Sequence, residues 1–495
     1  MAEHSSGAER NRWIALYVLC GGMLMIVLDA TIVNVALPTI KDDLGFSQSN
    51  LAWVVNGYLI AFGGLLLLSG RFGDILGYKS VFMAGLGVFT LASLLCGLAQ
   101  TEEMLVGARF VQGVGGAMTS AVILSMIVTM FPEARDQAKA MGVYAFVASG
   151  GGSVGLLLGG VLTESINWHW IFFVNVPIAI VTAILAARLL PRDEGIGFGD
   201  GADVLGALLI TSSLMIGVYT IVSPAAENGW GSASAIGFGA ASLLLLAAFI
   251  AREVRTANPI MPLRIFRSRN VSGANLVQAL SVAGMFGMFF LGSLYMQRVL
   301  GYSALEIGLA FIPVTLVMGT LSIRYTEPLI MRFGAKRTLI PGMGFILLGL
   351  VLFAQVPVDG SYVQDALPAM LLFGLGAGLS FPALMTIAMS GATKADAGLA
   401  SGLVNTSAQV GGALGLAVLA TLSASRSDRL IDGGEATASA LTSGYQLAFW
   451  IGAALVLAAI VVAITVLQPE EEAEAEFAEP EPIGPPEDQA FQEAA

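Results

Sequence analysis

The sequence predicts an all-α polytopic membrane protein, and three observations support this fold class. Charged residues make up 12% of the 495 residues, about half the roughly 25% of an average soluble chain. The mean hydropathy is +0.80. Uncharged stretches of membrane-spanning length follow one another along the chain. A soluble protein of this size could not cover its surface with so few charges, which excludes soluble enzymes and nucleic-acid-binding proteins.

Each long uncharged stretch is a candidate membrane helix, because a helix needs about 20 apolar residues to cross the hydrocarbon core. The stretches do not alternate polar and apolar residues as barrel strands do. One stretch is interrupted by Asp29, and the short stretch at 307–323 is followed by Arg324, whose side chain can reach the interface. The fourteen predicted spans are 13–40, 44–70, 80–101, 110–132, 140–163, 165–187, 204–226, 228–251, 270–297, 307–323, 338–358, 366–393, 397–425 and 436–469.

Basic residues predict the orientation, because Lys and Arg gather in cytoplasmic loops. With the N-terminus inside, 18 of the 23 Lys and Arg residues fall in inner segments, Lys394 among them, and 4 fall in outer loops. Both termini are therefore expected in the cytoplasm. Residues 1–12 are expected to be a polar cytoplasmic segment and not a signal peptide. Residues 468–495 form an acidic tail of Glu, Pro and Ala that we expect to be disordered.

The chain repeats itself at an offset near 257 residues. Three short segments return in equivalent loops or helices: LGFS at 44–47 as LGYS at 300–303, the loop glycine Gly77 as Gly334, and GGSVGL at 151–156 as GGALGL at 411–416. Three matches at nearly one offset make chance a poor explanation. We therefore expect an N-terminal six-helix bundle at 13–190, two inserted helices and a linker at 191–264, and a C-terminal six-helix bundle at 265–467.

Five segments combine glycine, charge and proline in motif-like patterns: DATIVNVALP at 29–38, GRFGDILGYK at 70–79, RFVQGVGG at 109–116, GGSVGLLLGG at 151–160 and WHWIFFVNVP at 168–177. Together they resemble the signatures of the fourteen-span drug:proton antiporter branch of the major facilitator superfamily. The resemblance covers about residues 13–467. It implies the major facilitator fold, with a substrate site between the two bundles near the middle of the membrane.

Asp29 and Arg109 are the candidate proton-coupling residues. An ionisable group inside an apolar span is costly and is a functional candidate by default. Burial disfavours the charged form of a carboxyl group and a nearby cation favours it, so Asp29 could bind a proton or a cationic substrate as water access alternates. Arg109 must find an acid or carbonyl groups, and Asp29 is its expected partner by depth. The alternative is a permanent structural ion pair.

The loop after the second span carries a candidate gate made of Gly70, Arg71, Asp74, Gly77 and Lys79. We expect Asp74 near the start of the third helix, where the helix dipole favours an anion. The resemblance implies that these charges form a latch that holds the inner gate shut. The alternative is a set of ordinary solvated loop charges.

A glycine stripe runs along the fifth span. Gly151, Gly155 and Gly159 recur at every fourth position, and Gly152 and Gly160 flank them. Such stripes allow close helix packing in membranes, and the resemblance implies that this stripe also serves as a pivot between the halves.

Polar and aromatic residues on other spans are candidates for lining the substrate cavity, since aromatic and Met side chains suit adaptable apolar pockets. For any one of them, packing or lipid contact is the alternative. Glu164 and His169 could form an outer protonation pair, or they could simply lie at the interface. The cavity candidates are Trp53, Asn56, Tyr58, Gln112, Asn275, Gln278, Met285, Phe286, Phe289, Asn405 and Gln409.

The expected function is secondary active export, with protons exchanged for amphiphilic or lipophilic drugs or antibiotics by alternating access. The alternatives are transport of a lipid or lipid-like amphiphile, or proton-coupled symport, on the same fold; a transport-inactive sensor or scaffold belongs to a different class. No nucleophile–base pair, phosphate loop or metal cluster is evident, so we expect no enzyme, cofactor or metal. The expected partners are a small amphiphilic substrate, protons and the lipid bilayer, and not nucleic acid. We expect a monomer in a bacterial inner membrane.

Overall fold

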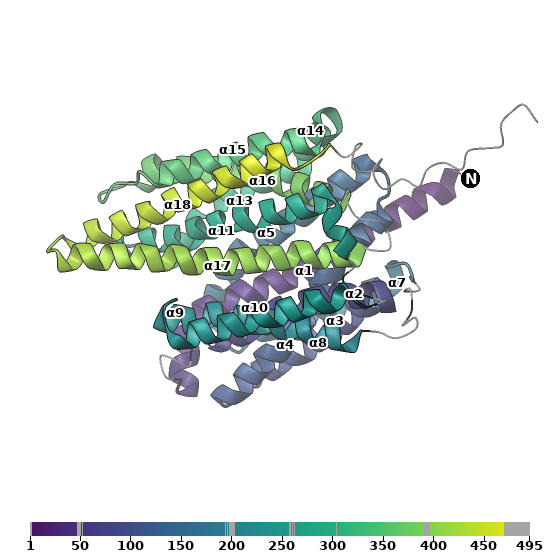
Figure 1. The fold of residues 1–495 in the computed structure, drawn as a ribbon, viewed down its shortest axis with the longest axis horizontal. Coiled ribbons are helices and arrows are strands. Elements are labelled where there is room, and N and C mark those ends of the chain that lie inside the picture. Colours follow the sequence, from purple (N-terminus) through teal and green to yellow (C-terminus); the bar gives the residue numbers. More distant parts are fainter. Residues whose placement is uncertain are drawn as a thin grey trace, which may run out of the picture.

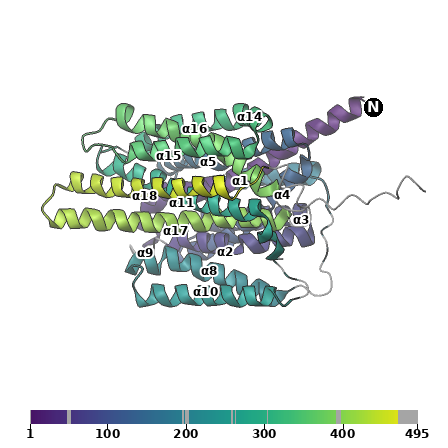
Figure 2. The same cartoon turned by 45° about the horizontal axis from the view of Figure 1, so that its top comes forward.

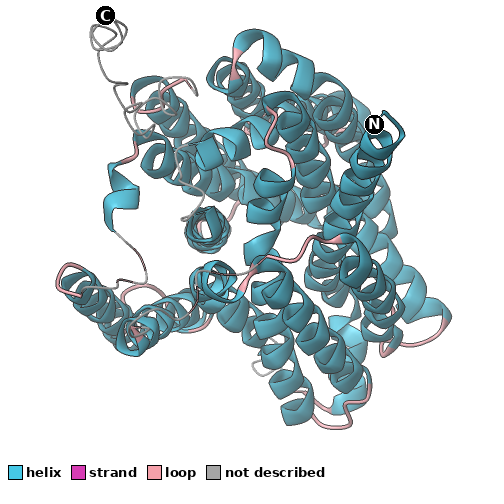
Figure 3. Ribbon diagram, turned by 90° about the vertical axis from the view of Figure 1, so that its right-hand side faces the viewer, coloured by secondary structure: helices cyan, strands magenta, loops and turns pink. Residues whose placement is uncertain are grey.

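The computed structural model describes residues 2–46, 51, 53–193, 195, 197, 203–256, 259, 261, 263–302, 304–390 and 397–469. Within these residues all regular secondary structure is helical (Figure 3). The long helices lie side by side along one axis (Figure 1). Lys394 and nearly all of the expected disordered tail at 468–495 lie outside the described residues.

The N-terminal half consists of five long helices and a sixth that is divided in two. These elements are α1 (Ala2–Leu44), α2 (Trp53–Leu76), α3 (Tyr78–Gly97), α4 (Glu102–Met130), α5 (Ala134–Ser165), α6 (Trp170–Phe173) and α7 (Asn175–Leu189). We call the end of the bundle at which α1 begins the proximal end and the opposite end the distal end.

An inserted helix pair and the C-terminal half follow. The insert consists of α8 (Val204–Val222), α9 (Pro224–Asn228) and α10 (Ala233–Glu253), and α9 lies at the distal end (Figure 1). The C-terminal half consists of η2 (Leu263–Arg267), α11 (Arg269–Arg298), α12 (Ala304–Ala310), α13 (Ile312–Thr320), η3 (Leu321–Tyr325), α14 (Thr326–Phe333), α15 (Ala335–Phe353), η4 (Tyr362–Ala366), α16 (Leu367–Ser390), α17 (Ala397–Asp432) and α18 (Thr437–Thr465).

Twelve helices of the described residues are long and apolar enough to cross a membrane, so the chain is a multi-pass membrane protein. Helix α5 makes a thirteenth if it is counted through a 41° bend between Gly152 and Leu157, next to a Gly-Ser pair of the kind at which helices kink. The apolar stretch of α8, Leu205–Ile221, is shorter. The expected number of fourteen spans stays a prediction.

The span expected at 307–323 is longer than the charge pattern indicated. It runs from Glu306 to Phe333, because the helix continues through the π turn η3 past Arg324 and ends only at Gly334, where φ is +83°. Thr326 stabilises this turn by donating its hydroxyl to the carbonyls of Leu321 and Gly378, both at 2.9 Å. The backbone of Arg324 is therefore helical.

The two halves repeat the same proximal contact. Lys79 at the start of α3 donates its ammonium group to the carbonyls of Ala187 and Leu190, at 2.9 and 2.8 Å, at the end of α7. At the equivalent place in the other half, Lys336 on α15 donates to two carbonyls at the end of α18. A cation suits a helix C-terminus, where unpaired carbonyls gather, so each lysine ties two helices of its own half together.

The glycine stripes also correspond between the halves. A Cβ atom on Gly155 would overlap the Thr31 hydroxyl on α1 and lie 3.1 Å from the carbonyl of Leu28. On the equivalent helix α17, a Cβ on Gly415 would overlap the backbone of Ala283 on α11. Helix pairs α1–α5 and α11–α17 therefore approach so closely that only glycine fits. Gly151 and Gly159 of the stripe also face α1, whereas a Cβ on Gly160 would meet nothing within 4 Å.

The inserted pair lies along one edge of the bundle (Figure 2). Helix α8 packs on α2 and α17, and Tyr219 of α8 stacks on Trp53 of α2 with ring centroids 5.8 Å apart. Ser213 of α8 and Ser242 of α10 donate their hydroxyls to each other's carbonyl oxygens, at 2.8 and 2.9 Å. The pair is thus a unit that contacts the N-terminal half through α2 and the C-terminal half through α17.

Candidate functional site

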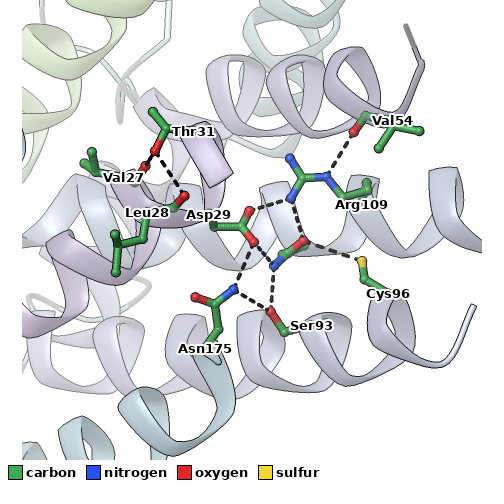
Figure 4. Close-up of polar contacts among 10 residues, drawn as sticks. Val27, Leu28, Asp29, Thr31, Val54, Ser93, Cys96, Arg109 and Asn175 are labelled. Atoms are coloured by element: carbon green, nitrogen blue, oxygen red, sulfur yellow. Dashed lines mark hydrogen bonds and ion pairs between the residues drawn. The ribbon is translucent and has the colours of Figure 1, made fainter. Parts of the chain in front are cut away.

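Asp29 of α1 and Arg109 of α4 form an ion pair inside the N-terminal half, between Asp29 Oδ2 and a terminal nitrogen of Arg109. The side chains are 0% and 1% exposed, so neither charge is shared with solvent. The two charges pair because an unpaired charge at this depth would bear the full free-energy cost of leaving water. The expected contact between these residues is therefore present (Figure 4).

Gln112, one helical turn after Arg109, joins this pair to α3. Its Oε1 accepts from Arg109 at 2.8 Å, while its Nε2 donates to Asp29 Oδ1 and to the hydroxyl of Ser93, both at 2.7 Å. Arg109 can only donate and an ionised Asp29 can only accept, so the chemistry fixes which way the Gln112 amide points.

The Arg109 guanidinium also contacts α2 and two aromatic rings. Its Nε donates to the carbonyl of Val54 on α2 at 2.9 Å. The guanidinium lies over the ring of Tyr58, 4.4 Å from the ring centre, and 5.8 Å from the ring centre of Phe172. Cation–π contacts of this kind are strongest where water is excluded. The cavity candidates Tyr58 and Gln112 are therefore buried members of this charge cluster.

Asn175 and Ser93 were not among the sequence-predicted site residues. Asn175 at the start of α7 donates its Nδ2 to Asp29 Oδ1 at 3.0 Å and to Ser93 Oγ at 3.2 Å (Figure 4). Both side chains are fully buried. The signal that could have found them is an uncharged polar residue inside an apolar stretch, since such a residue needs a hydrogen-bond partner when buried.

The candidate latch residue Asp74 contacts the other half of the protein. Asp74 lies in the last turn of α2, four residues before α3 begins at Tyr78. Its Oδ1 accepts from the backbone N–H of Gly398 and from the Tyr78 hydroxyl, both at 2.9 Å, and Arg71 lies 3.6 Å from Oδ2. The anion therefore sits at the N-terminus of α17, in the other half of the protein, where the helix dipole favours it.

Close backbone packing accompanies this contact. A Cβ on Gly70 would lie 2.5 Å from the carbonyl of Gly398, so glycine is required there. Gly77 has a φ of +91° at the turn between α2 and α3. Lys79, also expected in the gate, donates to the carbonyls at the end of α7.

Other hydrogen bonds also join the two halves at the proximal end. Ser401 of α17 donates to the carbonyl of Ala121 at 2.6 Å, and Ser125 of α4 donates to the carbonyl of Ala397 at 2.8 Å. On the other side of the bundle, Arg135 and Glu327 form an ion pair at 2.9 Å. These contacts hold the proximal ends of the two halves together.

The Major Facilitator Superfamily profile matches residues 19–416. The chain belongs to this superfamily. It is 40% identical to the cephamycin export protein of Amycolatopsis lactamdurans over 456 residues, 92% of each chain. It is 37% identical to the puromycin resistance protein of Streptomyces alboniger over 473 residues, 94% of this chain and 93% of the relative.

Solved structures show the same major facilitator fold. A proton:xylose symporter superposes with a TM-score of 0.66 at 14% identity, over 95% of this chain and 100% of the symporter. The human organic anion transporter MFSD10 superposes with a TM-score of 0.62 at 14% identity, over 90% and 99% of the two chains. At this identity the likeness establishes the fold alone.

The remaining cavity candidates of this major facilitator protein lie on α2, α11 and α17. Phe286 and Phe289 are 46% and 38% exposed, and the Phe289 ring packs against those of Phe311 and Phe373. Asn275 is nearly buried and accepts from the Ser407 hydroxyl at 2.7 Å. The others divide into buried Asn56, Gln278 and Met285, and half-buried Trp53, Asn405 and Gln409.

His169 does not contact Glu164 in this structure. Its Nδ1 faces the carbonyl of Gly97 at 3.0 Å, and its Nε2 lies 3.9 Å from Asp43 at the distal end of α1. Glu164 is exposed. The residue that His169 approaches is thus Asp43, which also accepts from the Trp168 indole at 2.9 Å.

Proposed function

We propose that this major facilitator protein is a secondary active exporter that exchanges protons for amphiphilic, antibiotic-like compounds. The observation that carries the proposal is the buried Asp29–Arg109 pair inside the bundle. The names of the relatives, cephamycin export protein and puromycin resistance protein, support export of antibiotics as the direction and substrate class.

Asp29 is the proposed site of proton coupling. Its carboxylate accepts from Arg109, Gln112 and Asn175, so its charge is balanced in the present conformation. When Asp29 binds a proton, the attraction that holds Arg109 is lost. Proton, substrate and Arg109 thus compete for one carboxylate, which couples the charge of Asp29 to the conformation of α1 and α4.

We further propose that the proximal end faces the cytoplasm, as the distribution of Lys and Arg favours. The contact of Asp74 with α17 then acts as the inner gate, held shut in this conformation. Rocking of the bundles at 13–190 and 265–467 would open it, with the glycine stripe on α5 as a pivot. The location proposed is the inner membrane of a bacterium, with a single copy of the chain as the transporting unit.

Fourteen membrane crossings, as in the drug:proton antiporter branch, are also a proposal. Helix α8 lies against α10, which is long enough to cross. Asp203 at the proximal end of α8 accepts from Arg252 at the proximal end of α10, at 2.7 Å. This contact places the proximal ends of α8 and α10 at similar depths, which supports a crossing by α8 beside α10. The fourteenth crossing proposed is that of α5, counted through its bend.

Transport in proteoliposomes with an imposed pH gradient tests the proposed function. Uptake of a fluorescent lipophilic cation should require the gradient in the wild type and be lost in Asp29→Asn, with folding checked by gel filtration. Asp359→Asn is the matched control, because Asp359 is an exposed carboxylate in the loop after α15. Dye movement that ignores the gradient would show that the antiport proposal is wrong, and labelled lipids would then test the lipid-transport alternative.

A further inference from the structure

Asn175 is the unusual member of the buried cluster, because half of its carboxamide is unused. The side chain is fully buried. Its Nδ2 makes two hydrogen bonds, to Asp29 and Ser93, but its Oδ1 has no hydrogen-bond partner among the described residues. In Figure 4 this oxygen points away from Asp29. A buried polar atom without a partner is rare and calls for an explanation.

Protonation of Asp29 would change what this carboxyl group needs from its neighbours. In the present arrangement Oδ2 faces Arg109, and Oδ1 faces the amide nitrogens of Gln112 and Asn175. All of these groups are donors. A proton bound at Oδ1 would make that oxygen a donor as well, and it would then face donors only.

Gln112 cannot supply the missing acceptor. Its Oε1 already accepts from Arg109 at 2.8 Å. Turning its amide over would place Nε2 against the guanidinium, and two donors would face each other. Gln112 is therefore held in one orientation for as long as Arg109 stays in place.

Asn175 can supply the acceptor, because its Oδ1 gives up no partner when the amide turns over. After a half-turn, Oδ1 occupies the place of Nδ2, which lies 3.0 Å from Asp29 Oδ1 and 3.2 Å from Ser93 Oγ. A carbonyl oxygen at that place can accept from a protonated Asp29 and from the Ser93 hydroxyl, which can donate or accept.

We propose that Asn175 is a positioning residue for the coupling proton: its carboxamide donates to ionised Asp29 and, turned over, accepts from protonated Asp29. This inference rests on the proposed function. The proton enters from water and stays bonded to Asp29 Oδ1, and no covalent bond of Asn175 changes. The other titratable groups next to Asp29 are Arg109 of α4, Tyr58 of α2 and Cys96 of α3, and none of them lies on α7.

Infrared difference spectroscopy between neutral and acidic pH tests this inference. The wild type should show a band from protonated Asp29 that disappears in Asp29→Asn. In Asn175→Leu, which keeps the side-chain size, the same band should move to higher frequency, because the carboxyl O–H has lost its acceptor. The control Asn270→Leu, a buried amide that bonds to the backbone of Gln468, should leave the band in place.

A label in the unmutated protein gives a second measurement in case Asn175→Leu does not fold. With ¹³C in the asparagine carboxamides, acidification should shift one labelled carbonyl band, and the shift should be lost in Asp29→Asn. An Asp29 band that Asn175→Leu leaves unmoved, or the absence of any labelled shift, would overturn the role of Asn175 alone. The absence of any band that depends on Asp29 would instead overturn the proposed function.

Discussion

Asp29 and Arg109 lie 80 residues apart in the sequence, on α1 and α4, and share a direct ion pair that solvent does not reach. Breaking a buried pair by removing one partner typically costs about 3–5 kcal/mol, because the other charge stays buried and uncompensated. Replacing both partners with apolar residues of similar size is often neutral or stabilising. We therefore expect the effects on stability of substituting Asp29 and Arg109 to be strongly non-additive.

Asp29→Leu and Arg109→Met should each lower the thermal stability of the purified protein more than the double variant does. Melting followed by tryptophan fluorescence in detergent measures this. The matched control is Arg135→Ala, since Arg135 is 76% exposed in its pair with Glu327 and exposed pairs contribute about 0–1 kcal/mol. Additive losses for Asp29 and Arg109 would contradict the ion pair as the source of the effect.

The charged part of this cluster could be predicted from the sequence, whereas the uncharged part could not. A carboxylate inside an apolar span requires a cation as partner, and the sequence places Arg109 at about the same membrane depth as Asp29. Asn175 and Ser93 carry no charge, so the sequence does not indicate which residue each of them hydrogen-bonds to. Gln112 was a cavity candidate because it is a polar residue within a span, and that property does not show which neighbour its side chain faces.

Contacts between distant parts of the chain could not be predicted from the sequence either. The two-bundle fold follows from hydropathy and from the repeat, both of which are properties of local sequence. The contact between Asp74 and Gly398 joins residues 324 positions apart, and it depends on how the two halves meet in one conformation. Local sequence could therefore single out Asp74 as a candidate gate residue but could not indicate the helix terminus that it contacts.

The contact between Asp74 and α17 predicts how firmly the proximal end is closed. A hydrogen bond to a charged group contributes about 1.5–3 kcal/mol, and 1.4 kcal/mol is a tenfold change in population. Asp74→Ala should therefore shift the closed-to-open ratio at the proximal end by roughly tenfold or more towards open. Spin labels at Leu76 and Met331, which are 43% and 48% exposed, would report this as a longer distance.

The second contact between the halves provides the comparison for Asp74. Arg135→Ala removes an exposed ion pair, so the same spin labels should show less than about a fivefold change in the closed-to-open ratio. Equal effects of the two variants would argue that Asp74 acts as an ordinary surface charge.

The glycine stripes predict that a glycine-to-alanine substitution lowers stability for a different reason in each half. Gly155→Ala would clash with the Thr31 hydroxyl, a side-chain group that can be removed, and Thr31→Ala should therefore restore part of the lost stability. Gly415→Ala would clash with the backbone of Ala283, so the helices themselves must separate and no side-chain change should rescue it. Overpacking of this kind typically costs about 1–3 kcal/mol.

Gly160→Ala is the control on the same helix, because Gly160 flanks the stripe and a Cβ there would meet nothing within 4 Å. Its melting temperature should match that of the wild type. If Gly160→Ala were as harmful as Gly155→Ala, the loss would reflect helix flexibility and not close packing.

The surroundings of Asp203 predict that the stability of the inserted pair depends on pH. Burial alone would raise the pKa of Asp203, but the Gly206 N–H and the Arg252 guanidinium outweigh it and lower the pKa below its usual value. For a carboxyl group whose folded pKa is lowered, the stabilisation is present above the unfolded pKa and is lost as pH falls through the folded pKa. The unfolded pKa of Asp is about 3.9.

Asp203→Asn separates this titration from that of every other acidic group in the chain. Asn can still cap α8 but carries no charge for Arg252. The melting temperature of the wild type should exceed that of the variant at neutral pH, and the difference should shrink as the pH falls below about 4. Equal melting temperatures at neutral pH would mean that capping by residue 203, and not the charge of Asp203, stabilises the end of the inserted pair.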